Sequence, residues 1–214
     1  MAKPINIGIA AGVAGLAGTI ALLVGDLAAS LSTPDYSLAR DSISSLALTP
    51  IGWLQTIGFL ALGLLLEVFV VGLLVNVGRA RGFNLGIGLL ALCGFGLLMI
   101  GAFPMDPAGA TRTTQGLIHS VTAYTIALLF PISLMLLTPS LKSDPRWEKL
   151  FAYTLVAAVS GLAMVPGLFF LPNIERWFGL YERIMVANVM VWVAVAAVHL
   201  LRLSRRRQRQ PGAC

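Results

Sequence analysis

The sequence predicts an all-α integral membrane protein, a bundle of six transmembrane helices with both termini in the cytoplasm. The first observation is composition: 57% of the 214 residues are hydrophobic and 11% are charged, whereas soluble domains carry about 25% charged residues. The second is that six apolar runs reach the roughly 20 residues that a helix needs to cross a bilayer. The third is the uneven distribution of Lys and Arg among the connections between those runs.

The six apolar runs indicate one transmembrane domain over residues 1–204, followed by a basic cytoplasmic tail over residues 205–214. Lys3 precedes the first run. That run is long and has no clear Ala-x-Ala cleavage site, so we interpret it as a span and not as a signal peptide. The expected spans are Ile5–Ala29, Ile51–Val77, Asn84–Phe103, Gly116–Leu137, Leu150–Leu171 and Tyr181–Leu203.

Basic residues indicate the orientation of the bundle. With the N-terminus inside, eleven of the 15 Lys and Arg residues fall in inner segments, five of them in the last thirteen residues. The outer segments hold the other four, Arg40, Arg112, Arg176 and Arg183. The positive-inside rule therefore places both termini in the cytoplasm. A basic tail beside a span is typical of contact with anionic lipid, and without a basic soluble domain no nucleic-acid partner is expected.

Local patterns predict how the spans pack. Small residues recur at four-residue spacing in the first run, as at Gly8 and Gly12, which lets helix backbones approach closely. A dimer interface and packing against another span of the same chain both fit this pattern, and we favour the second. Pro131 and Pro166 are expected to kink the fourth and fifth spans. In the first outer loop, Tyr36–Leu46 is expected to form a short interfacial helix.

Glu67 is the deepest acidic residue, in the inner half of the second span. A charged side chain at the centre of a membrane helix costs about 2.5–3.5 kcal/mol on insertion scales. Glu67 could serve as a proton carrier or cation ligand. The alternative, which we favour, is a protonated carboxyl group hydrogen-bonded to a neighbouring helix.

Polar residues from three separate segments gather on the expected outer side. The connection between the third and fourth spans, "GAFPMDPAGATRTTQGLIH", carries Asp106, Arg112 and His119. Because Asp106 and His119 belong to one connection, they can approach each other. The first outer loop and the start of the last span supply further members of this group, namely Asp26, Tyr36, Ser42, Ser44, Ser45, Glu182 and Arg183.

Three kinds of site fit this outer group. One is a Ser–His–Asp arrangement with His119 as base, Asp106 as its orienting partner and Ser44, Ser45 or Ser120 as nucleophile, although no G-x-S-x-G motif is present. A second is a metal site formed by the same His119 and Asp106 with Asp26.

That ligand set is thin and lacks an H-x-x-x-H pair, so neither a metal nor a cofactor is predicted. The third kind of site is structural. Asp106 and Glu182 would pair with Arg112, Arg183 or His119 to hold helix ends, since semi-buried charges need partners. Considered without any resemblance to a family, the residues favour this third alternative.

Three motifs resemble the prokaryotic polytopic membrane family catalogued as domain of unknown function 998. They are "YSLARDSISSLA" at 36–47, "GAFPMDP" with "GLIHSVTA" at 101–107 and 116–123, and "GLYERI" at 179–184. The resemblance implies six helices and a membrane location, but no activity. Met105 stands where a cysteine is common in the family, which weakens any thiol or metal chemistry there. The motif members that carry over, with unknown roles, are Tyr36, Ser37, Ser42, Ser44, Asp106, His119, Glu182 and Arg183.

The leading functional hypothesis is a protein of the prokaryotic cytoplasmic membrane with a polar site facing the outer leaflet. This site would bind a lipid headgroup or a small amphiphile, so membrane lipid is the expected partner. The alternatives are a lipid hydrolase or transferase at the Ser–His–Asp group, an accessory or assembly subunit that binds a second copy or a membrane partner, and a proton-coupled transporter that uses Glu67. The expected ligand-binding residues are Tyr36, Ser42, Arg112, Glu182, Arg183 and Asp26.

Overall fold

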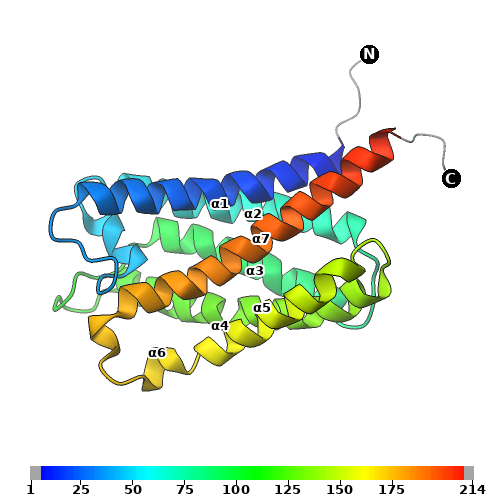
Figure 1. Ribbon diagram of the computed structural model, residues 1–214. Helices are drawn as coiled ribbons and strands as arrows, with labels where there is room; N and C mark the ends of the chain where they lie inside the picture. The colour runs from blue at the N-terminus through cyan, green and yellow to red at the C-terminus, as the bar shows by residue number, and fades with distance from the viewer. Residues whose placement is uncertain (1–5, 210–214) are drawn as a thin grey trace, which may run out of the picture.

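The computed structural model describes residues 6–209, and within this range every regular element is a helix (Figure 1). Six helical segments are long and apolar enough to cross a membrane. In chain order the elements are α1 (Ile7–Ser32), the 3₁₀ helix η1 (Ile43–Leu48), α2 (Trp53–Asn76), α3 (Phe83–Ala102), α4 (Thr114–Ser143), the 3₁₀ helix η2 (Glu148–Leu150), α5 (Phe151–Met164), α6 (Gly167–Phe170), the 3₁₀ helix η3 (Ile174–Arg176) and α7 (Phe178–Arg209).

The all-α prediction of six apolar spans is confirmed, with differences at the helix ends. The helix α4 continues past the expected end at Leu137 to Ser143, because Pro139 is accommodated and Asp144 caps the helix. The first outer loop forms its short helix at Ile43–Leu48 instead of Tyr36–Leu46. Residues 205–209 continue α7, so the expected boundary at 205 does not coincide with a helix end, and residues 210–214 lie outside the described part.

The fifth span is interrupted, as Pro166 led us to expect. The helix α5 ends at Met164, and α6 begins at Gly167 after a turn that contains Pro166. Proline has no backbone N–H to donate within a helix and its ring crowds the preceding turn. The break makes α6 a separate short segment below α7 at one end of the bundle (Figure 1).

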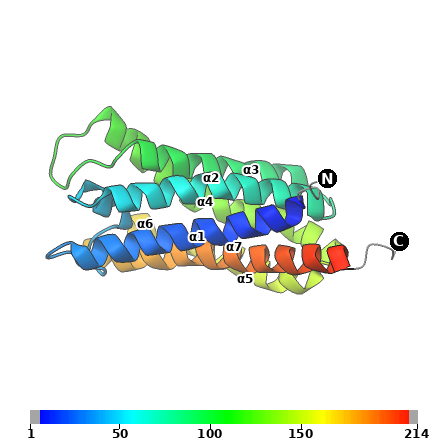
Figure 2. The same cartoon turned by 90° about the horizontal axis from the view of Figure 1, so that it is seen from above.

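The six spans form a ring in which each helix packs mainly on its neighbours in sequence. The contacts run from α1 to α2, α2 to α3, α3 to α4 and α4 to α5, and α7 closes the ring against α1. Figure 1 shows α7 crossing the bundle diagonally and meeting α1 toward the two chain termini, and Figure 2 shows the same pair from above. By contrast, α5 touches α7 over a short stretch, and the backbones of α4 and α7 stay apart.

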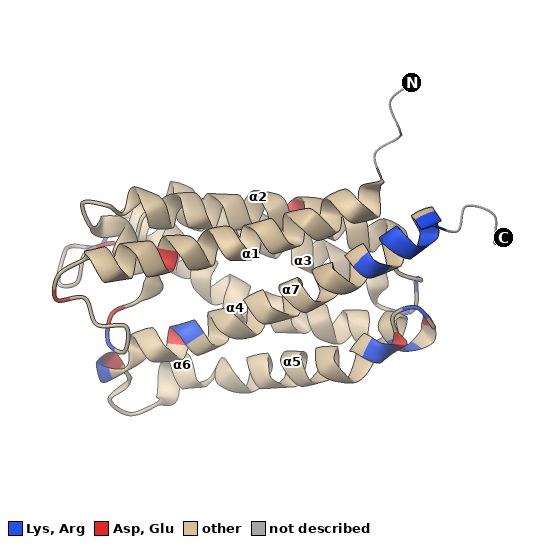
Figure 3. Cartoon of the chain, turned by 45° about the horizontal axis from the view of Figure 1, so that its top comes forward, with Lys and Arg blue, Asp and Glu red and all other residues tan. Residues whose placement is uncertain are grey.

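Both ends of the described chain lie at the same end of the bundle, which we call the terminal end. The opposite end, formed by residues 33–52, 103–113 and 171–177, is called the loop end (Figure 1). Figure 3 shows charged residues at both ends and an almost uncharged middle, as expected for a bilayer-spanning bundle. The last turns of α7 at the terminal end carry Arg206, Arg207 and Arg209.

The small residues of α1 are used for packing within the chain. A Cβ atom added at Gly12 would lie 2.9 Å from the backbone oxygen of Ala197 on α7, and one at Gly15 would lie 2.9 Å from the Ala197 side chain and 3.0 Å from Phe69 on α2. This close approach is what small residues permit in membrane helices. The intrachain alternative is therefore confirmed for these two glycines.

The core is densest in the terminal half of the bundle. Trp192 packs edge-to-face against both Phe69 and Phe130, and its indole N–H donates to the Thr154 hydroxyl at 3.0 Å. The loop half has only a small buried group around Leu22 and other apolar residues of η1, α2 and α3. The loop half consequently contains the larger cavities of the bundle.

At the terminal end, Asp144 joins the connection between α2 and α3 to the end of α4. Its carboxylate accepts a hydrogen bond from the Gly78 N–H at 2.8 Å and a bidentate pair from Arg146 at 2.9 and 2.7 Å. The Arg146 hydrogen bond is the main reason that the pKa of Asp144 falls to about 2, with the Gly78 and Arg146 backbone N–H groups adding to the effect. The Asp144 side chain is 5% exposed.

Replacing Asp144 with asparagine is expected to lower the stability of the folded protein by about 2 kcal/mol at neutral pH, because charge-assisted hydrogen bonds are lost. A carboxyl group whose pKa is lowered by folding contributes stability above its ordinary pKa, and that contribution is lost as the pH falls through about 2. Thermal unfolding in detergent should therefore show a lower melting temperature for Asp144→Asn than for wild type, and this difference should become smaller as the pH is lowered. Glu148→Gln, which changes an exposed carboxylate, serves as control. A difference in melting temperature that does not change with pH would show that the Asp144 carboxylate does not stabilise the fold in this way.

Candidate functional site at the loop end

Arg183 is the centre of a polar cluster at the loop end, formed by Asp26, Tyr36, the 37–43 backbone, Glu182 and Arg183. Its Nη2 atom donates to Asp26 Oδ1 at 3.0 Å and to the Tyr36 hydroxyl at 2.6 Å. Its Nη1 atom donates to the backbone oxygens of Leu38 and Asp41, both at 3.1 Å. The Asp26 and Arg183 side chains are 13% and 17% exposed, so this ion pair joins α1 to α7 in a largely dry setting.

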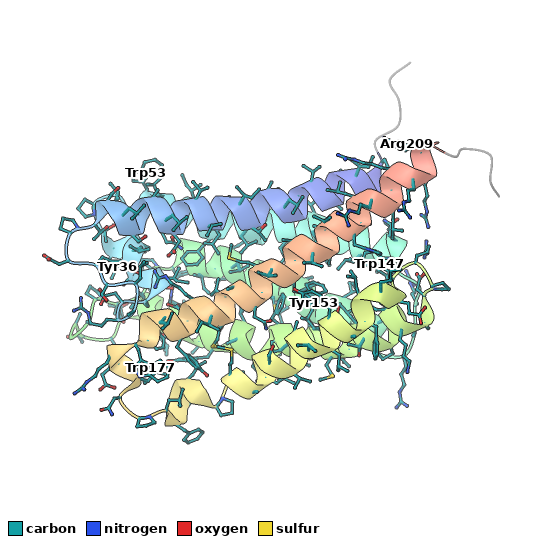
Figure 4. All side chains as sticks on the ribbon, viewed as in Figure 1. Tyr36, Trp53, Trp147, Tyr153, Trp177 and Arg209 are labelled. Atoms are coloured by element: carbon teal, nitrogen blue, oxygen red, sulfur yellow. The ribbon has the colours of Figure 1, made fainter. Side chains whose placement is uncertain are left out.

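Tyr36 connects Arg183 to the first loop. Its hydroxyl donates to the backbone oxygen of Ser42 at 2.8 Å, and its ring lies beside the Arg183 guanidinium. Burial raises the pKa of Tyr36, which keeps the phenol protonated and able to donate. Figure 4 shows Tyr36 at the loop end between the ends of α1 and α7, far from Trp147 and Arg209.

The first loop also caps the start of α7 with its backbone. The N–H groups of Gly179 and Leu180 donate to the backbone oxygens of Arg40 and Ala39 at 3.2 and 3.0 Å. The first N–H groups of a helix have no partner within the helix and need such acceptors. Gly179 is essential to this arrangement, because a Cβ atom there would collide with the backbone oxygens of Asp41 and Leu38.

Glu182 points to the other side of α7. Its Oε2 atom accepts a hydrogen bond from the Ile43 N–H at 2.6 Å, at the start of η1. Ser42 is the N-cap of η1, because its hydroxyl oxygen accepts from the Ser45 N–H at 3.1 Å. The Ser42 hydroxyl also lies 3.6 Å from the Met105 sulfur, which links the first loop to the connection after α3.

Asp106 caps the start of α4. It accepts from the backbone N–H and the hydroxyl of Thr113 at 3.0 and 2.7 Å, and Thr113 is itself the N-cap that accepts from the Gly116 N–H. The two hydrogen bonds from Thr113 lower the pKa of Asp106. Gly116 leaves room for this carboxylate, which would overlap any Cβ atom at that position. Arg112, on the same connection, is exposed.

His119 is buried and joins α4 to the end of α3. Its Nδ1 atom lies 2.8 Å from the backbone oxygen of Phe103, the C-cap residue of α3. Because a carbonyl oxygen only accepts, Nδ1 carries the proton in this hydrogen bond. Among residues 6–209, no hydrogen bond joins His119 to Asp106.

The serines of the proposed nucleophilic group have other partners. The Ser45 hydroxyl donates to the Ser42 backbone oxygen at 2.7 Å, and the Ser120 hydroxyl donates to the Gly116 backbone oxygen at 2.8 Å. Ser44 is buried and lines a cavity. In the described part of the chain, none of these hydroxyls is hydrogen-bonded to His119. The contacts at Asp106 and His119 are thus contacts that hold helix ends.

Glu67 lies apart from this cluster, on α2 where it packs against α3. A Cβ atom added at Gly94 would lie 2.5 Å from the Glu67 carboxylate, so the absence of a side chain at Gly94 makes room for it. The carboxyl group therefore rests on the α3 backbone within the membrane-spanning region. Its use as a proton site stays a prediction.

Two apolar hollows flank α7 at the loop end. One has a volume of about 150 Å³ and lies among η1, α2, α3, α4, α7 and the ends of α5 and α6, with Glu182 at its wall. The other has a volume of about 270 Å³, lies between α1 and α7, and has Asp26 and Arg183 at its wall. Because Glu182 and Arg183 are consecutive on a helix, their side chains diverge and each serves a different hollow.

Comparison with known proteins assigns the chain to a family. Residues 16–199 match the family described as "Protein of unknown function (DUF998)". The chain belongs to the DUF998 family. No curated protein and no solved structure matches it. In this DUF998 protein the three motifs noted in the sequence supply the contacts just described: Tyr36 and Arg183 join the first loop to α7, and Asp106 holds Thr113 at the start of α4.

Two residues that line the smaller cavity of this DUF998 protein, Ala127 and Asn188, were not predicted from the sequence. Ala127 of α4 lines the smaller hollow, but nothing distinguishes it in sequence from a lipid-facing alanine. Asn188 of α7 also lines it, and its Nδ2 donates to the Ala157 backbone oxygen at 2.9 Å. An asparagine in the middle of an apolar run was the one available signal, because polar side chains at membrane depth tend to face the protein interior.

Proposed function

We propose that this DUF998 protein binds an amphiphile from the outer leaflet of a prokaryotic cytoplasmic membrane, with both termini in the cytoplasm. The observation that carries the proposal is the position of the Glu182 carboxylate on the wall of a mainly apolar cavity of about 150 Å³. Ligand pockets are typically apolar with a few placed polar groups that orient the ligand. The orientation is supported by the excess of Lys and Arg in the segments at the terminal end.

The cavity is placed to receive a ligand from the bilayer. Its wall includes Tyr124 of α4 and Leu168 of α6, near the interruption in the fifth span. Tyr124 is 45% exposed on the outer surface of the bundle. The lining thus includes residues on both sides of this interruption, Gly161 of α5 and Leu168 of α6, and we propose that the ligand enters here.

A cavity-filling variant tests this proposal. Ala127→Trp would place an indole in the cavity. Leu128→Trp would place the indole at the next position, where the native leucine is 42% exposed on the outside of the bundle. We expect native mass spectrometry of wild type and Leu128→Trp to show a bound amphiphile of constant mass, and Ala127→Trp to lose it. If folded Ala127→Trp retains the same amphiphile, the proposal is wrong.

A further inference from the structure

The polar groups that line the smaller cavity favour one class of ligand headgroup. Four lining residues carry polar side-chain atoms, namely Ser44, Tyr124, Glu182 and Asn188, and no Lys, Arg or His is among the lining residues. Glu182 uses Oε2 to accept from the Ile43 N–H, while Oε1 takes no hydrogen bond from residues 6–209. The unused oxygen of a carboxylate is an acceptor that needs a donor.

Arg183 does not offset this preference. Its Nη atoms are already bound to Asp26, to Tyr36 and to three backbone oxygens, and they lie on the wall of the other hollow. Its Nε atom is buried and has no partner among residues 6–209. A phosphate or carboxylate in the smaller cavity would therefore meet the carboxylate of Glu182, and no Lys, Arg or His lines the cavity to bind it.

The apolar part of the cavity limits the size of the hydrocarbon part of the ligand. Phe59, Leu97, Ile126, Phe130 and Val189 contribute to its wall. Its volume of about 150 Å³ equals that of an engineered apolar cavity known to bind benzene. A space of this volume suits one ring or one short length of a single chain, and the rest of a longer chain would extend outside the cavity.

Resting on the proposed function, we infer that the ligand is a single-chain or single-ring amphiphile whose polar end is a hydrogen-bond donor, an alcohol or an ammonium group, bound by Glu182. Oε1 accepts the donor, and the hydrocarbon fills the cavity. Lipids that end in a phosphate or a carboxylate are rejected, because they bring a second anion to an acceptor-lined site.

The test uses three amphiphiles with the same tail, oleylamine, oleyl alcohol and oleic acid. Each competes with a fatty alcohol that carries a diazirine in its tail, and labelling of the purified full chain in mixed micelles is mapped by mass spectrometry. We expect oleylamine and oleyl alcohol to displace the label at concentrations at least about tenfold lower than oleic acid, the effect of one charge-assisted hydrogen bond. A preference for the amine over the alcohol would identify an ammonium ligand, and equal competition a neutral one.

Glu182→Gln is the matched variant, because the amide oxygen can still accept from Ile43. We expect it to reduce oleylamine competition by about tenfold while labelling of the cavity persists. Oleic acid competing as well as the other two, or Glu182→Gln leaving the ranking unchanged, would overturn the headgroup assignment alone. Labelling that Ala127→Trp does not reduce would instead show that the proposed function is wrong.

Discussion

Replacing Arg183 with methionine is expected to destabilise the folded protein by about 3–5 kcal/mol, the cost of leaving one member of a buried ion pair without its partner. The variant leaves Asp26 at the α1–α7 contact without its counter-charge. It also removes the donors that hold the backbone oxygens of Leu38 and Asp41 against α7. Thermal unfolding followed by tryptophan fluorescence in detergent should show this loss, and the yield of folded protein should fall with it.

A second variant separates this effect from a general sensitivity to charge at the loop end. Arg112→Met removes an exposed arginine from the same end and should change the melting temperature little. Asp26→Asn combined with Arg183→Met should be less harmful than the sum of the single changes, because no unpaired charge then stays buried. Strict additivity in this cycle would show that Asp26 and Arg183 contribute independently.

Gly179→Ala is expected to displace the first loop from the start of α7. A Cβ atom would lie 2.8 Å from the Leu38 backbone oxygen and closer still to that of Asp41, and backbone atoms cannot rotate aside. Overpacking of this kind costs about 1–3 kcal/mol, and the hydrogen bonds from Gly179 and Leu180 to the loop would be lost with it. We expect a lower melting temperature and faster hydrogen exchange at the amides of residues 36–43.

Gly88→Ala is the matched control, since a Cβ atom at that glycine of α3 meets nothing within 4 Å. Alanine favours helix by up to about 1 kcal/mol over glycine, so this variant should be neutral or slightly more stable. If Gly179→Ala behaves like Gly88→Ala, the loop does not depend on close approach to α7. If both variants lose stability equally, the loss comes from replacing a helical glycine in general and not from the contact between Gly179 and the first loop.

The spans could be predicted from sequence because one physical requirement, the exclusion of charged side chains from the hydrocarbon of the membrane, determines where they lie. Helices that cross hydrocarbon need long uncharged runs, and few other structures produce such runs. Helix ends depend on smaller terms. The extension of α4 to Ser143 rests on a cap at Asp144 that involves Gly78, 66 residues earlier in the chain, and no local pattern signals that contact.

The cluster at the loop end could be predicted as a group but not as a set of pairs. Topology brings Asp26, Tyr36 and Arg183 to one end, so their proximity was foreseeable. Asp106 and His119 were expected to approach each other because they share a connection, yet Thr113 and the Phe103 carbonyl bind them instead. Nearness in sequence limits which groups can meet, whereas backbone partners, which sequence does not mark, decide which ones do.

The interruption between α5 and α6 beside the cavity has a consequence for how tightly the proposed ligand would have to be held. An amphiphile that arrives sideways has already left water, a transfer that contributes about 0.8 kcal/mol for each CH₂ group. Almost none of that free energy is then gained again in the cavity, so occupancy depends on the mole fraction of the ligand in the leaflet and on the one contact that lipid cannot supply. The proposed binding would then select amphiphiles by their polar groups, and its occupancy would follow changes in membrane composition without requiring high affinity.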